Sequence, residues 1–324
     1  MNFHLQFPIT PFPEKIKYSQ PFLFLGSCFA ENIGETMQDY KFNVKINPHG
    51  VLYNPLSITV ALRRYMENKE MQENDLFFAN DCWNSWEHHS RFSNISKQDC
   101  LEEINQNIST THEDLKKVEW LFITFGSAFV YKRKDTGGLV GNCHKIPQKE
   151  FTKHLLTTNE IIVDYNNLIK EVHLINPKLK IVFTISPVRY MRDGALENTR
   201  SKARLVEAVH ELVDIHANAF YFPAYELVID DLRDYRFYKT DLVHPNEQAI
   251  EYVFEKLMTA SFDEETKSLF EKIKELKAAA SHRPFNSTTA SHKKFKATYL
   301  DRCIQLKEKF PYLDLSDEVK RFGV

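Results

Sequence analysis

The stretch PFLFLGSCFAENIG, residues 21–34, decides the fold predicted for this chain. Its apolar run at 22–25 ends in the Gly-Ser-Cys triplet 26–28, and spaced apolar positions among good helix formers follow over 29–40. This order predicts a strand, a tight turn and a helix. A hydroxyl and a thiol therefore stand side by side where a buried strand ends.

The same strand-and-helix pattern recurs along the chain. Four further apolar segments predict strands, at residues 42–46, 120–126, 180–188 and 219–222. Helical patterns follow or separate them, at residues 55–66, 98–117, 151–175, 196–217, 225–232 and 245–258. Parallel strands need such crossovers, so the alternation predicts an α/β fold with a doubly wound, five-stranded parallel sheet. Long excursions from the sheet, with hairpins, are expected at 70–96 and 128–144.

The composition shifts near residue 260. Two charged helical segments, KSLFEKIKELKAAA and KFKATYLDRCIQLKEKF, are joined there by the polar linker SHRPFNSTTASH. We expect an α/β domain over 1–260 and a C-terminal helical extension over 261–324. The sequence does not define an oligomeric state.

Charge and cysteine usage narrow the function classes. The 324 residues include 42 basic and 44 acidic side chains, and no long block of like charge is present. We therefore expect no nucleic acid and no membrane partner. No signal-peptide or membrane-spanning pattern is present either, which predicts a cytoplasmic protein. The five cysteines are scattered without a C-x-x-C pair, so neither a disulfide framework nor a metal or other cofactor is predicted.

Polar residues follow the predicted strands, and the carboxyl ends of parallel strands share one edge of the sheet. After the last strand, Asp241 and His244 lie three residues apart, just before Pro245. A carboxylate that orients an imidazole would be half of a nucleophilic site. The alternative for this pair is a surface loop that caps a helix. At the other end of the chain, the turn of Ser27 and Cys28 offers unpaired amides and a helix dipole, which we expect to lower the pKa of a thiol.

Several separated motifs resemble those of the GSCFA-domain family. They are GSCFA (26–30), NCHK (142–145), SPVR (186–189), YFPAYE (221–226) and DLRDYRFYKTDLVHP (231–245), within a match over residues 22–258. The family resembles a branch of the SGNH/GDSL hydrolases. The resemblance implies a flavodoxin-like three-layer α/β/α sandwich.

The resemblance also implies catalytic roles. The Gly-Asp-Ser motif of SGNH enzymes, laid on this turn, makes Cys28 the nucleophile by register, whereas Ser27 has the residue type that the superfamily uses. Asp241 would be the orienting acid and His244 the general base.

An oxyanion-hole donor is implied at Gly50. The Asn of the family's third block is missing, because Ala128 stands there. Asn142 or His144 could reach that place from the long loop.

Other polar residues have two readings each. Trp83, Trp86, His88 and His89 could line a sugar-binding wall, or the tryptophans could clamp a loop onto the core. Arg189 could bind a carboxylate or phosphate of a substrate, or be paired structurally. A metal reading of Cys143 and His144 with nearby Cys and His side chains lacks a recurring ligand spacing.

We therefore expect an acyl-ester hydrolase or acyltransferase with a Cys or Ser nucleophile. The family resemblance suggests a small-molecule or carbohydrate O-acyl ester as substrate. The alternatives are a catalytically inactive binding module that keeps the crevice, and a redox sensor at Cys28.

Overall fold

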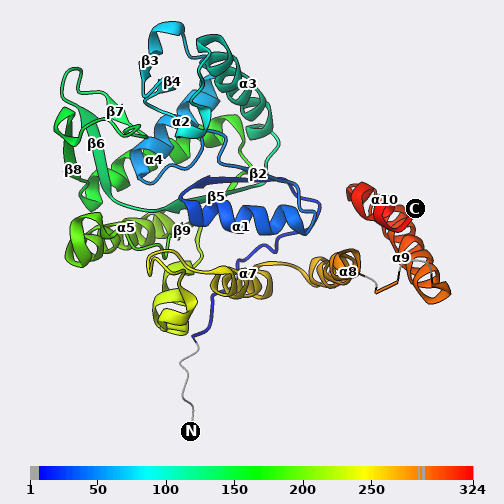
Figure 1. The fold of residues 1–324 in the computed structure, drawn as a ribbon. Coiled ribbons are helices and arrows are strands. Elements are labelled where there is room, and N and C mark those ends of the chain that lie inside the picture. The colour runs from blue at the N-terminus through cyan, green and yellow to red at the C-terminus, as the bar shows by residue number, and fades with distance from the viewer. Residues whose placement is uncertain (1–6, 284, 287–288, 324) are drawn as a thin grey trace.

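The computed structural model describes residues 7–283, 285–286 and 289–323, and a five-stranded parallel sheet lies at its centre (Figure 1). The strands are β1 (Phe22–Gly26), β2 (Val44–Ile46), β5 (Trp120–Phe125), β9 (Lys180–Ile185) and β10 (Ala219–Tyr221). Their order across the sheet is β10-β9-β5-β1-β2, the flavodoxin-like order. The predicted fold class and its five parallel strands are confirmed.

Helices cover both faces of the sheet. One face carries α1 (Cys28–Asp39) and α7 (Glu247–Ser261), drawn below the sheet in Figure 1. The other carries α2 (Pro55–Glu67), α3 (Lys97–Leu115), α4 (Thr158–Ile175) and α5 (Gly194–Ile215). The strand order changes direction at β1, and right-handed crossovers on the two sides of that point place their helices on opposite faces.

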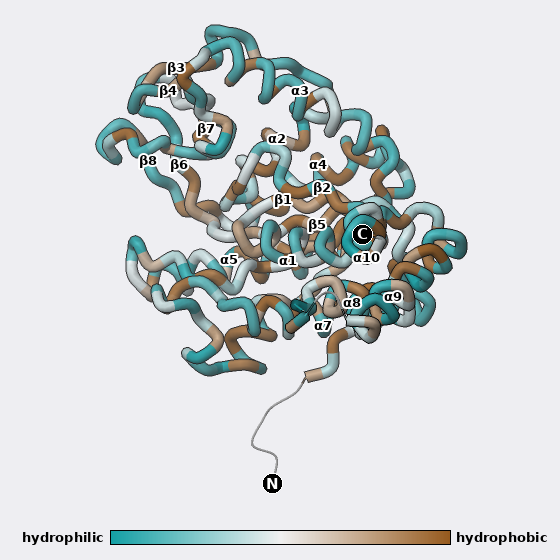
Figure 2. Tube along the Cα trace, turned by 45° about the vertical axis from the view of Figure 1, so that its right-hand side comes forward, coloured by the Kyte–Doolittle hydropathy of each residue, from teal (hydrophilic) through white to brown (hydrophobic). Residues whose placement is uncertain are grey.

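The apolar strands supply both cores by alternation. In β1, Phe22 and Phe24 pack into the core under α1, whereas Leu23 and Leu25 pack into the core under α2 and α4. β5 repeats the pattern, because successive side chains of a strand point to opposite faces. Hydrophobic segments accordingly gather around β5, β2 and α4 in Figure 2, while the outer turns of α3 are hydrophilic.

Two small antiparallel sheets form the excursions. The first is the hairpin of β3 (Leu76–Ala79) and β4 (Cys82–Ser85). The second pairs β6 (Phe129–Arg133) with β7 (Leu139–Val140) and β8 (Phe151–Leu155). The helix predicted over 151–175 was wrong at its start, because 151–155 form β8. A capping box of Thr157 and Glu160 begins α4 after that strand.

The C-terminal segment is helical, with α8 (Glu264–Ser281), α9 (Ala290–Lys309) and α10 (Ser316–Gly323). It extends the core beside α1: the rings of Tyr40 and Phe270 meet edge to face at 4.7 Å, and Lys41 pairs with Glu318 at 3.0 Å. The domain boundary near residue 260 stays a prediction.

The segment predicted as a helix over 225–232 consists of the short α6 (Ala224–Glu226) and a π-helical turn (Leu227–Leu232). Across the described part of the chain, no helix combines the length and the apolar character needed to cross a bilayer.

Candidate active site

The turn after β1 is built on a glycine. Gly26 has φ +132°, and a Cβ there would lie 2.1 Å from the carbonyl oxygen of Thr124 on the adjacent β5. Only glycine tolerates both the conformation and the approach. The next residue, Ser27, donates its N–H to the same carbonyl at 3.1 Å. This close contact begins α1 at Cys28, directly at the carboxyl edge of the sheet.

The two candidate nucleophiles are in different environments. Ser27 is fully buried, and its Oγ caps α1 by accepting the N–H of Phe29 at 3.3 Å. Cys28 is only half-buried and has no such cap role. Both residues line one cavity, but the thiol is the more accessible group.

Burial raises the pKa of the Cys28 thiol, and the carboxylate of Glu31 raises it further. The N–H groups of Cys28 and Phe29 and the ammonium of Lys202 oppose this shift. The net direction is opposite to the sequence-based expectation, because desolvation outweighs the helix N-terminus. The thiol is therefore protonated at neutral pH and needs a base to become a nucleophile.

Asp241 and His244 form a hydrogen-bonded pair. His244 Nδ1 lies 2.7 Å from Asp241 Oδ2, and Oδ1 accepts the N–H groups of Val243 and His244 at 2.9 and 3.0 Å. A left-handed Leu242 (φ 57°) closes the turn. These N–H donors, the one from His244 first, lower the pKa of Asp241 to about 2. The carboxylate thus stays ionised, and it favours the tautomer with the proton on Nδ1 and a free Nε2.

The cavity that Cys28 lines also contains His244. Its volume is about 890 Å³, and the turn after β1, the loop after β9 and the 241–244 loop all contribute to its wall. The N–H of Arg189 donates to the carbonyl of Val243 at 3.2 Å, which ties the loop after β9 to the loop that carries the imidazole. The first and last parts of the α/β domain therefore meet at one site.

Gly50 is not brought to this cavity. Its N–H donates to the carbonyl of Asn47 at 2.6 Å, and its α-carbon packs so closely on His89 that a Cβ would lie 2.2 Å from the histidine Cβ. The glycine serves a tight turn, with φ +78°. The prediction that Gly50 donates to an oxyanion therefore does not fit this geometry.

Asn54 is a residue that the sequence reasoning missed. It follows a segment that borders the carboxyl ends of β1 and β5. In that segment, Leu52 donates its N–H to the carbonyl of Gly26, and the carbonyl of Tyr53 accepts the N–H of Gly126. The side chain is buried and lines the cavity. Its Oδ1 caps α2 by accepting the N–H of Ser57 at 2.9 Å, which directs the amide NH₂ away from the helix. A capping Asn in a Tyr-Asn-Pro sequence reads only as a helix start, so local pattern conceals this donor.

Replacing Asn54 by Asp or by Ser tests that donor. Both side chains can still cap α2, but both lack the amide NH₂. If this amide stabilises an oxyanion, its loss should lower kcat for ester hydrolysis by about 10²- to 10³-fold. Ester turnover and urea unfolding should be measured together. If the apparent fall in kcat is fully explained by a smaller folded fraction in the urea unfolding curves, Asn54 acts only as the cap of α2.

Asn142, His144 and His89 line the cavity from the excursions. Asn142 Oδ1 accepts the N–H of His144 at 2.8 Å, and His144 Nε2 lies 2.8 Å from the carbonyl oxygen of Ser85. His144 is buried, and burial lowers its pKa. These contacts hold the β3–β4 hairpin and the loop after β7 together, so the first role of His144 is to build the wall.

The tryptophans of the first excursion also pack locally. Trp86 stacks on Phe77 with ring centroids 3.7 Å apart. Trp83 meets the ring of Phe78 and lies under the ammonium of Lys97. Of the aromatic set predicted here, only His89 lines the cavity.

Lys202 is the second residue that sequence reasoning missed. It is buried in α5 and donates to the carbonyl oxygens of Gly126 at 2.7 Å and Ser186 at 2.5 Å, the residues that follow β5 and β9. Its neighbour Ser201 accepts the N–H of Ala128 at 2.7 Å. Helix α5 thus fixes the floor of the cavity. Burial lowers the pKa of Lys202 to about 7, and nearby Cys28 opposes this shift.

This lysine makes stability depend on pH. Because its folded pKa of about 7 lies below the ordinary lysine value, the unfolded chain binds more protons above pH 7. Stability therefore rises with pH from about 7 toward 10. The unfolding free energy of wild type minus that of Lys202→Met should increase by about 2 kcal/mol between pH 7 and pH 9. Urea unfolding at both pH values measures it, and a constant difference would contradict the assignment.

Among the described residues, no three Cys, His, Asp or Glu side chains form a group that could hold a metal ion. Cys143 and His144 are adjacent at the cavity wall, but the histidine Nε2 is engaged by a carbonyl.

The fold and the cavity define a doubly wound α/β protein with a thiol and a carboxylate-backed imidazole at the carboxyl edge of its parallel sheet. The chain belongs to the GSCFA family, whose sequence profile matches residues 21–257. A second profile, for the C-terminal domain of GSCFA domain proteins, matches residues 273–323. A search of curated proteins found no match.

Two solved structures are similar to this chain at low identity. A "putative acylhydrolase" from Bacteroides fragilis is 11% identical, with 80% of this chain and 92% of that chain covered and a TM-score of 0.40. An acetyl xylan esterase from the rumen bacterium Butyrivibrio proteoclasticus is 9% identical, with 75% and 65% covered and a TM-score of 0.39. We draw no functional conclusion from TM-scores this low.

Proposed function

We propose that this protein hydrolyses or transfers the acyl group of an ester or thioester, with Cys28 as nucleophile. The observation that carries the proposal is the shared cavity: an accessible thiol lines it together with an imidazole whose Nδ1 is held by the carboxylate of Asp241. A nucleophile, a base and an orienting acid are the parts that acyl transfer needs. A small-molecule or carbohydrate O-acyl ester is the proposed substrate.

The chemistry follows from these positions. His244 Nε2 takes the proton of the Cys28 thiol as Sγ bonds to the acyl carbonyl carbon. The N–H of Cys28 and the amide of Asn54 stabilise the oxyanion. Collapse of the tetrahedral intermediate breaks the bond to the alcohol or thiol, which receives the proton from the imidazolium. Water or an acceptor alcohol then attacks the acyl-Cys28 thioester and restores the enzyme.

A binding module without turnover is the second candidate. The hydrogen bond from Gly50 to Asn47 favours it, because it removes one oxyanion donor that the SGNH resemblance implies.

p-Nitrophenyl esters of short and long acyl chains, combined with iodoacetamide labelling and mass spectrometry, separate the two candidates. The enzyme should release nitrophenol and lose activity as Cys28 is alkylated, whereas buried Cys100 and Cys303 provide internal controls for selective labelling. Absence of turnover with every ester would leave the binding module.

A further inference from the structure

The wall of the cavity carries cations without matching anions. Lys145, Arg189 and Arg192 line it, and none of the described residues that line it is Asp or Glu. The histidines in the wall can only add positive charge. The field inside the cavity therefore favours a negatively charged group.

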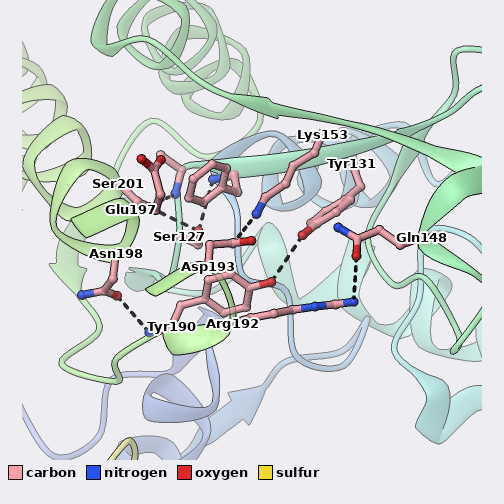
Figure 3. A network of polar contacts seen from close by, with 12 residues as sticks. Ser127, Tyr131, Gln148, Lys153, Tyr190, Arg192, Asp193, Glu197, Asn198 and Ser201 are labelled. Atoms are coloured by element: carbon pink, nitrogen blue, oxygen red, sulfur yellow. Dashed lines mark hydrogen bonds and ion pairs between the residues drawn. The ribbon is translucent and has the colours of Figure 1, made fainter. Parts of the chain in front are cut away.

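Acidic residues beside the cavity are already engaged by other groups, and Asp241 holds His244 Nδ1 at 2.7 Å. Asp193 forms an ion pair with Lys153, shown in Figure 3. At the other side of the site, Glu31 lies 3.7 Å from Arg91. Neither carboxylate forms an ion pair with the two arginines of the wall, although Tyr190, then Tyr131 and more weakly Asp193 raise the pKa of Arg192.

Within the described ranges, neither guanidinium group is held in an ion pair, and Arg192 hydrogen-bonds to the Tyr190 hydroxyl. In the part of the chain that the structure describes, no carboxylate lies within ion-pair distance of Arg189 or Arg192. Arg189 is half-buried and stands over the ring of Tyr238 at 5.4 Å. Arg192 reaches Gln148 Oε1 at 3.5 Å, a long and weak contact (Figure 3).

Hydroxyl donors stand beside these cations. The hydroxyl groups of Tyr131 and Tyr190 lie 3.3 Å apart, and both residues line the cavity. Burial raises the pKa of Tyr190 to about 12, so its hydroxyl stays protonated. Planar guanidinium groups together with hydroxyl donors are the groups that bind carboxylate and phosphate oxygens.

We propose that the acyl ester or thioester on which this site acts carries an anionic group, a carboxylate or a phosphate, and that Arg189 and Arg192 bind it. The inference rests on the proposed function for the reaction. It adds the charge of the substrate and the residues that select it. Because Arg189 is hydrogen-bonded to the loop of His244, the anionic group lies on the imidazole side of the cavity.

Matched aryl acetates test the preference. The probes are 4-acetoxybenzoate, 4-acetoxyphenyl phosphate and the neutral methyl 4-acetoxybenzoate, and each kcat/KM is divided by the rate constant with hydroxide to remove intrinsic reactivity. The normalised value for at least one anionic ester should exceed that of the neutral ester by about tenfold or more. The better of the two anions identifies the group.

The double variant Arg189→Gln/Arg192→Gln should lower the ratio of anionic to neutral kcat/KM by about 10- to 100-fold. Arg200→Gln is the matched control, because Arg200 lies on the exposed side of α5, pairs with Glu197 at 2.7 Å and does not line the cavity. An equal response of the control variant would assign the preference to overall charge and overturn the proposal.

Calorimetric titration with 4-hydroxybenzoate, phenyl phosphate and methyl 4-hydroxybenzoate separates this inference from the proposed function. Binding of an anionic product that requires the two arginines, without turnover of any ester, would reject the enzyme and keep the anion site. Turnover without preference for charge and without dependence on the arginines would do the reverse.

Discussion

Replacing His244 by Ala is expected to lower kcat for ester hydrolysis by about 10³- to 10⁴-fold. The reason is the state of the thiol: burial raises the pKa of Cys28, so very little thiolate exists at neutral pH without a base. Initial rates with a p-nitrophenyl ester measure the loss. Because the base acts on the reacting thiol, kcat should fall far more than KM rises.

A second histidine provides the control for this variant. His154 is exposed, lies 3.0 Å from Glu160 and does not line the cavity, so His154→Ala removes an acid-paired imidazole from elsewhere on the surface. Its kcat should remain near that of wild type. If His244→Ala also stays within about tenfold of wild type, His244 is not the base.

The second large effect is expected at the turn after β1. Cys28→Ala should lower kcat by about 10⁴-fold or more, because no acyl-enzyme can form. Ser27→Ala should instead lower the free energy of unfolding by about 1 kcal/mol, because the cap of α1 is lost, and should retain most of the catalytic power. Turnover measures kcat, and urea unfolding measures the free energy of unfolding. Mass spectrometry of the acylated peptide shows which residue carries the acyl group.

Ser96→Ala is the matched control for the cap. Ser96 caps α3 by accepting the N–H of Asp99 at 3.2 Å, far from the turn, and its loss should have a similar effect on stability. If Ser27→Ala abolishes turnover while Cys28→Ala preserves it, the nucleophile is the hydroxyl and the cap must open during the reaction.

Local features explain how much of the fold could be predicted. Residues 22–25 and 120–123 are continuous apolar runs because their strands are buried on both faces, and such runs are visible without coordinates. The helix predicted from residue 151 begins too early, because 151–155 also contain residues that fit a helix. Thr157 and Glu160 form the capping box that marks the true start of α4. The pairing of Asp241 with His244 is local too, since a turn of four residues suffices for it.

The rest of the site depends on contacts between distant segments. Asn54 and Lys202 carry no motif, and they matter because the chain brings them to the ends of β1, β5 and β9. The family resemblance implies an oxyanion donor at Gly50, yet the N–H of Gly50 is used by a turn. Sequence order does not say which amides are already bonded.

The sequence by itself determined the sheet, its crossovers, the glycine turn and the acid–imidazole pair, because each depends on neighbours within a few residues or on simple alternation of apolar and polar segments. The tertiary structure alone decided that the thiol shares a cavity with the imidazole, that two arginines of its wall lack acidic partners, and that burial outweighs the helix dipole at Cys28. Desolvation and shared surfaces arise only when segments far apart in the chain exclude water together.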